Sequence, residues 1–165
     1  MRSGDLVRLD VGCEQGHYIG DLGRTVPVSG HYDEDQRETW TIFVAAYHAG
    51  VVGLHDGATE DQIFDAWRAE LLRHRASAKT LLAQHALGSW SDRKNVPYWQ
   101  VHTQTRWPVS RLGHSGRERR STLSRSPRWM ARGFFLEDMY IITKDGAELF
   151  TPGVYSAEEI EAAMR

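Results

Sequence analysis

Two strand-like segments near the start of the chain, joined by a short turn, limit how it can fold. Residues 6–13 and 18–28 are rich in β-branched and aromatic residues, and Gln15-Gly16 lies between them. A two-residue turn that contains glycine favours a tight antiparallel hairpin. We therefore expect a β-hairpin that turns at Gln15-Gly16.

This hairpin brings two aspartates together. A turn at Gln15-Gly16 places Asp10 directly opposite Asp21 on the neighbouring strand. Opposite Cβ atoms lie about 4.5–5.5 Å apart, and like charges in such a pair are destabilising. Protonation or a nearby arginine would compensate, and a divalent cation bound by both carboxylates would do so best. The alternative is a solvated edge hairpin whose carboxylates point at water.

Helices are expected after the hairpin. Apolar residues recur at helical spacing over residues 36–54, and Asp33 precedes them as an N-cap. Thr59 predicts the start of a second helix, which extends to about residue 72. Residues 80–103 show no clear pattern, and Leu87-Gly88 suggests a loop.

The end of the chain again predicts strands. Residues 134–143 are strand-like, and Asp145-Gly146 predicts a turn back into residues 147–150. Ser156 and Glu159 predict the capping box of a final helix. Hairpins at both ends with helices between them predict an α+β fold in one domain, residues 1–165.

Residues 104–132 differ in composition from the rest of the chain. They hold eight Arg, no Lys and one acidic residue, Glu118. Three interpretations stay open: a segment translated in a shifted reading frame, a disordered insertion, or an arm that binds nucleic acid. We favour the shifted frame, because back-translation with GC-rich codons, read from the third base at Gln104, permits an ordinary loop-and-strand sequence. The coding DNA decides between them.

Two separated motifs resemble those of a known family. The stretches "GDLVRLDVG…GDLGRTVPVSG" and "GFFLEDMYIITKDGAELFTPG" are similar to metal-ligand motifs of the pita-bread metallopeptidases, which include methionine aminopeptidase, Xaa-Pro aminopeptidase and creatinase. The resemblance implies a pita-bread fold that lacks much of its first half and is disrupted over residues 104–132. It also implies two divalent metal ions (Mn²⁺, Co²⁺, Fe²⁺ or Zn²⁺), with Asp10, Asp21 and Glu137 as ligands.

The same resemblance requires a histidine and a second glutamate between the two motifs. We favour His102, in the strand-like run "YWQVHT", over His85, which we interpret as an ordinary structural histidine. Glu118 is a poor match for the glutamate, because arginine rather than proline follows it and no apolar strand carries it. One ligand is therefore unaccounted for.

The function that the resemblance implies is hydrolysis of N-terminal residues from peptides, of the Xaa-Pro aminopeptidase type, by a water activated at the two metal ions. Two alternatives stay open: an inactive fragment, and a binding module that keeps this fold without the chemistry. Nucleic-acid binding through the arginine-rich block is less favoured. A peptide substrate and a homodimer are the expected partners.

Composition adds an expectation about the compartment. The chain has a single cysteine, Cys13, so it cannot form an internal disulfide. Its N-terminus has no apolar stretch of the kind found in signal peptides. The longest apolar run, residues 42–54, is too short to cross a bilayer. These features predict a cytoplasmic protein without a membrane segment.

Overall fold

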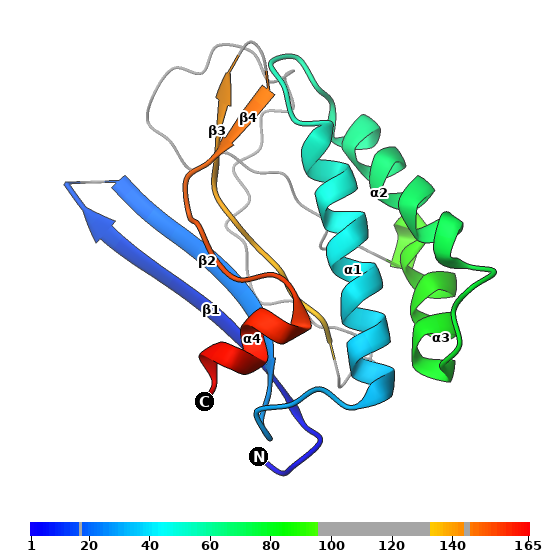
Figure 1. The fold of residues 1–165 in the computed structure, drawn as a ribbon. Coiled ribbons are helices and arrows are strands. Elements are labelled where there is room, and N and C mark those ends of the chain that lie inside the picture. Colours follow the sequence, from blue (N-terminus) through cyan, green and yellow to red (C-terminus); the bar gives the residue numbers. More distant parts are fainter. Residues whose placement is uncertain (17, 96–132, 144–145) are drawn as a thin grey trace.

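The computed structural model describes residues 1–16, 18–95, 133–143 and 146–165 (Figure 1). The predicted ligand His102 and the whole arginine-rich block, residues 104–132, lie outside the described residues. Within the described parts of the chain, no helix is both long and apolar enough to span a bilayer.

The chain begins with the predicted hairpin, but in a different register. Strand β1 (Leu6–Gln15) pairs with β2 (Tyr18–Pro27), so Gln15 belongs to the ladder instead of the turn. Gly16 follows β1 with φ of +59°, the left-handed conformation that a tight hairpin turn requires at its first central position. Because the turn starts at Gly16, every pair is displaced from the predicted register.

This displacement corrects the predicted pairing of the two aspartates. Asp10 lies opposite Gly23, and Asp21 lies opposite Gly12, so the two carboxylates are diagonal neighbours rather than a direct pair. The partner of each residue moves by two positions, and side chains alternate between faces with a period of two. Asp10 and Asp21 therefore still lie on the same face of the hairpin.

Three helices follow: α1 (Glu34–Val52), α2 (Glu60–His74) and α3 (Leu81–Trp90), with a short 3₁₀ turn at Arg93–Asn95. The N-caps are those predicted. Asp33 and Thr59 each form a capping box with the glutamine three residues later. The predicted loop at Leu87-Gly88 is wrong, because both residues lie inside α3 and Leu87 is buried in the core.

The C-terminal part crosses back to the hairpin. Residues 134–139 run beside β2, and Glu137 forms an antiparallel bridge with Gly23 through hydrogen bonds of 2.9 and 3.0 Å. Strands β3 (Tyr140–Thr143) and β4 (Gly146–Leu149) then form a second hairpin. The chain ends in α4 (Ala157–Ala163), which has the predicted Ser156–Glu159 capping box.

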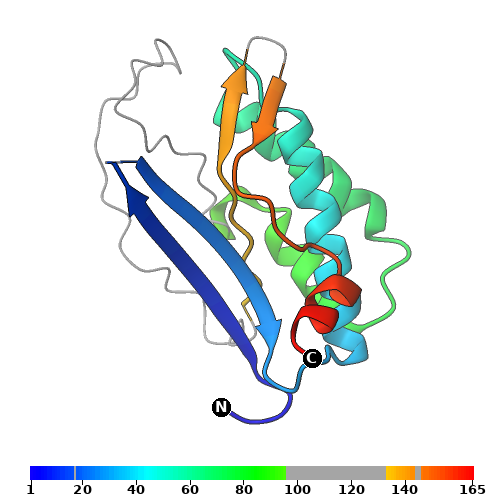
Figure 2. The ribbon, with the colours of Figure 1, turned by 60° about the vertical axis from the view of Figure 1, so that its left-hand side comes forward.

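Strands and helices form two layers, as Figures 1 and 2 show. The core between the helices is rich in aromatic rings: Phe43 of α1 makes edge contacts with Trp67 and Trp90, each with centroids 5.1 Å apart. Phe134 and Leu136 pack onto this core and the adjoining cluster around Trp40. Alternate residues of the 134–139 segment therefore fasten the strand layer to the helices.

We expect the Thr59 cap to contribute measurably to stability. Its hydroxyl accepts from the Gln62 amide, and the Gln62 side chain accepts from the Thr59 amide. Thr59→Ala should lower the free energy of unfolding by about 1 kcal/mol, measured by urea denaturation followed by circular dichroism. Thr59→Ser keeps the hydroxyl and should stay close to the parent. Equal losses in both variants would contradict the capping role.

Candidate metal centre

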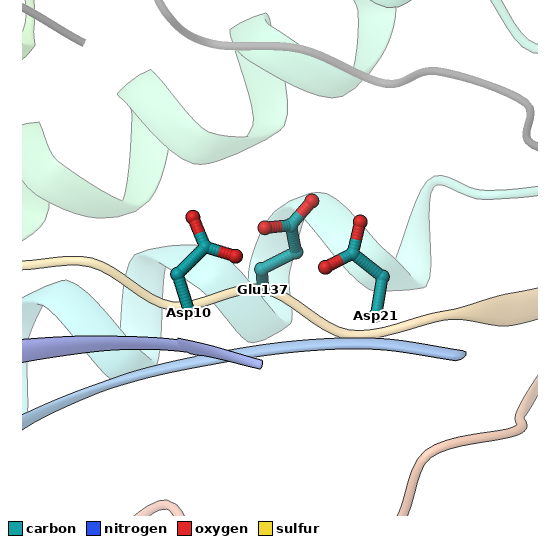
Figure 3. A group of neighbouring side chains, drawn as sticks. All are labelled: Asp10, Asp21 and Glu137. Atoms are coloured by element: carbon teal, nitrogen blue, oxygen red, sulfur yellow. The ribbon is translucent and has the colours of Figure 1, made fainter. Parts of the chain in front are cut away.

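Three carboxylates converge on one face of the strand layer. Asp10 comes from β1, Asp21 from β2 and Glu137 from the segment beside β2, and one ligand atom of each lies within 4.8 Å of the others. Figure 3 shows the three side chains on the same side of the strands, turned toward one another. Asp10 is exposed, whereas Asp21 and Glu137 are half-buried.

Gly23 makes this arrangement possible. It is the partner of both Asp10 and Glu137, so it lies between the two carboxylate-bearing backbones. A Cβ atom at Gly23 would lie 2.1 Å from Cε1 of Phe135, far closer than atoms can approach. The ring of Phe135 thus occupies the space above Gly23, on the same face as the carboxylates.

Thr25 continues the pairing between the two segments next to Gly23. Its Oγ1 donates to the carbonyl of Phe135 at 3.1 Å and accepts from the Phe135 amide at 2.6 Å. The Thr25 side chain is fully buried. Thr25 and Gly23 therefore hold Phe135 and Glu137 in register with β2.

An exposed arginine lies beside the carboxylate cluster. Arg8 is the described cation next to the carboxylates: it lies 3.5 Å from the centre of the Phe135 ring and 3.8 Å from Oδ2 of Asp10. The side chains of Arg8 and Asp10 are 38% and 57% exposed, and exposed pairs of this kind contribute little. The Arg8–Asp10 pair therefore does little to neutralise the Asp10 carboxylate.

The donor set fits a divalent metal. Carboxylate oxygens are hard ligands that suit Mn²⁺, Mg²⁺ and Ca²⁺, and they also bind Zn²⁺ and Fe²⁺. Within the described part of the chain the cluster contains carboxylates and no histidine. His85, the disfavoured candidate, is an exposed residue of α3. Glu118 and His102 lie outside the described residues, so both assignments stay as the sequence left them.

Sequence reasoning missed a buried polar network on the opposite face. Arg24 and Asp138 form an ion pair of 2.7 Å between Nη2 and Oδ1, and the Asp138 side chain is completely buried. The hydroxyls of Tyr47 and Tyr155 each donate to the other carboxylate oxygen at 3.0 Å. Burial, together with the Asp138 charge, raises the pKa of both tyrosines, so they act as protonated donors. The alternation of side chains along a strand could have indicated it. Arg24 follows Gly23 and Asp138 follows Glu137, so both side chains point away from the carboxylate face.

Comparison with known proteins agrees with this geometry. Residues 1–144 match the sequence profile of "Metallopeptidase family M24". The chain belongs to this family. The Xaa-Pro aminopeptidase of Escherichia coli (strain K12) is 28% identical over 193 residues, covering 99% of this chain and 42% of that protein. Xaa-Pro aminopeptidase 1 of Streptomyces coelicolor is 39% identical over 115 residues, covering 69% of this chain and 21% of that protein.

Solved structures of aminopeptidases share the fold. Proline aminopeptidase P II from Yersinia pestis matches with a TM-score of 0.65 at 24% identity, over 99% of this chain and 42% of that one. Aminopeptidase PepP from Pseudomonas aeruginosa matches with a TM-score of 0.61 at 20% identity. These structural matches confirm the α+β fold class, and the profile match over residues 1–144 confirms the predicted family resemblance.

The chain spans about 42% of the length of the E. coli relative. That match extends over 193 aligned positions, more than the 165 residues of this M24 chain. Gaps therefore interrupt this chain's side of the alignment.

We expect Gly23 to tolerate no side chain. Gly23→Ala forces the Phe135 ring to move, and overpacking of this kind costs about 1–3 kcal/mol of unfolding free energy. Gly88→Ala is the matched control, because Gly88 lies within helix α3 and a Cβ there meets nothing within 4 Å. That control should stabilise the protein by about 0.5–1 kcal/mol. Urea unfolding measures both, and a neutral Gly23→Ala would contradict the close approach.

Proposed function

We propose that Asp10, Asp21 and Glu137 bind divalent metal ions and that the protein is a metal-dependent hydrolase of the Xaa-Pro aminopeptidase type. The convergence of three carboxylates from three backbone segments carries this proposal. Membership of family M24 supports it, because that family typically depends on a dinuclear metal centre. The assignment of His102 as an imidazole ligand stays a prediction. The cytoplasmic location and the homodimer also stay predictions.

The separation of the carboxylates suits a pair of ions. Ions in two-metal hydrolytic sites lie about 3.5–4 Å apart, and ligand atoms within 4.8 Å of one another can bridge such a pair. When bound, the ions supply a water of lowered pKa and a Lewis acid for the peptide carbonyl. The residues of this chain hold the ligand oxygens on hydrogen-bonded strands, which fixes their positions better than a loop would.

The substrate class follows from the relatives rather than from a described pocket. Several relatives are named Xaa-Pro aminopeptidases, so we propose a peptide with proline in second position. A second candidate function is a metal-binding module without turnover. The observation that favours it is that Glu118, the candidate for the second glutamate ligand, is followed by arginine rather than proline.

Metal binding should depend on all three carboxylates. Asp10→Asn, Asp21→Asn and Glu137→Gln each remove one negative charge and one ligand, so each should weaken Mn²⁺ binding by at least about tenfold. Isothermal titration calorimetry gives affinity and stoichiometry, with two ions expected per chain. Glu148→Gln on β4, an exposed residue outside the cluster, should bind like the parent. Undiminished binding in the Asp10→Asn, Asp21→Asn double variant would show that the site is misassigned.

Turnover separates the two candidate functions. The Mn²⁺-loaded protein should release the first residue of a short Xaa-Pro peptide, and chelation with EDTA should abolish the release because the activated water is lost. Liquid chromatography of the products measures this directly. Tight metal binding without release of the first residue identifies the non-catalytic module instead.

A further inference from the structure

A fully buried carboxylate, that of Asp138, lies in the strand layer directly beside a proposed metal ligand. Asp138 follows Glu137, and because side chains alternate along an extended segment, the two point to opposite faces. Glu137 joins the carboxylate cluster, whereas Asp138 lies toward α1 with its side chain wholly buried. A buried charge is costly unless it is paired and hydrogen-bonded.

Both oxygens of Asp138 are satisfied by the network. Oδ1 accepts from Nη2 of Arg24 at 2.7 Å, and Oδ2 accepts from the hydroxyls of Tyr47 and Tyr155 at 3.0 Å. The guanidinium of Arg24 also lies 4.7 Å from the centre of the Tyr155 ring. Gly153 leaves room for it, because a Cβ there would lie 2.4 Å from Nη2. The Arg24 side chain is therefore held in one position.

That position is next to the backbone of the metal face. Nη1 of Arg24 donates to the carbonyl of Gly23 at 2.7 Å and to the carbonyl of Glu137 at 2.9 Å. These two carbonyls also accept the two backbone hydrogen bonds of the Gly23–Glu137 bridge. One guanidinium nitrogen thus adds a second bond to each carbonyl that sets Glu137 against β2.

We propose that Arg24 and Asp138 are positioning residues that fix the Glu137 carboxylate relative to Asp21 and Asp10. Tyr47 and Tyr155 complete this device by holding Asp138. In this proposal neither charged residue is a metal ligand: Arg24 acts on the carbonyls of Gly23 and Glu137, and Asp138 acts by holding Arg24. This inference rests on the proposed metal-binding function for its consequence, but the geometry of the bridge can be measured without metal.

The first measurement follows the bridge itself. Arg24→Lys keeps the positive charge but loses the planar fork that reaches Asp138 and both carbonyls together. Amide hydrogen exchange of Gly23 and Glu137, followed by NMR in metal-free protein, should accelerate at least about tenfold. The matched control is Arg37→Lys, which alters the ion pair between α1 and Glu158 and Glu161 of α4. It should leave both amides as in the parent.

The second measurement follows the metal. Supporting partners of metal ligands typically contribute 10–100-fold in affinity, so Arg24→Lys should raise the Kd for Mn²⁺ at least about tenfold at a temperature where the variant is fully folded. If that variant does not fold, Tyr155→Phe keeps the ring and removes one donor to Asp138. Tyr155→Phe should also accelerate amide exchange at Gly23 and Glu137 and raise the Kd for Mn²⁺, but only about two- to fivefold.

The outcomes distinguish this inference from the proposed function. Parent-like exchange at Gly23 and Glu137 in Arg24→Lys and in Tyr155→Phe overturns the positioning role, whatever the metal does. Faster exchange with parent-like Mn²⁺ affinity overturns it too, because the network would then be structural only. If the parent protein binds no Mn²⁺ but exchange is faster in Arg24→Lys, the proposed metal site is refuted. The role of Arg24 in holding the Gly23–Glu137 bridge is then supported.

Discussion

The bridge between Gly23 and Glu137 is the contact on which the described structure depends. It joins the N-terminal hairpin to a segment that follows three helices in the sequence, and it does so through two backbone hydrogen bonds. On one side of the bridge Glu137 reaches the aspartates of the hairpin. On the other side Leu136 enters the cluster with Trp40 and Ile160. A single pairing therefore forms the carboxylate cluster and closes the core.

Because side chains alternate along the strands, one face of the strand layer carries the carboxylate cluster and the other carries the buried polar network. Asp21, Gly23 and Thr25 lie on the carboxylate face, while Arg24 between them points to the buried network. The same division occurs in the crossing segment at Glu137 and Asp138. The face that carries the three carboxylates is thus backed by the buried Arg24–Asp138 ion pair. Carboxylates can gather there because the strands that bear them are anchored from behind.

Local signals were enough to predict much of the fold. The hairpins, α1, α2 and the capping boxes follow from turn glycines, apolar spacing and cap residues. The register was wrong because Gly16 starts the turn, yet the aspartates kept a common face because the displacement preserved the period of two. Helix α3 was missed since Gly88 suggests a loop, whereas burial of Leu87 and Trp90 decides the outcome.

The candidate site was predictable only in part, because some of its contacts join residues far apart in the sequence. Asp10 and Asp21 share a hairpin, so local geometry brings them together, but Glu137 was assigned through the family resemblance. No local pattern could place Arg24 against the Glu137 carbonyl, because that contact exists only after the crossing segment has docked.

Docking of residues 134–139 brings three carboxylates within 4.8 Å of one another, and like charges at this distance repel. A metal ion bound there, as proposed, would add stability by mass action, about 2.7 kcal/mol at 100 times the Kd. The Arg24–Asp138 network holds the backbone of the Gly23–Glu137 bridge, and the proposed cation would act on the same bridge from the opposite face by relieving the charge of Glu137.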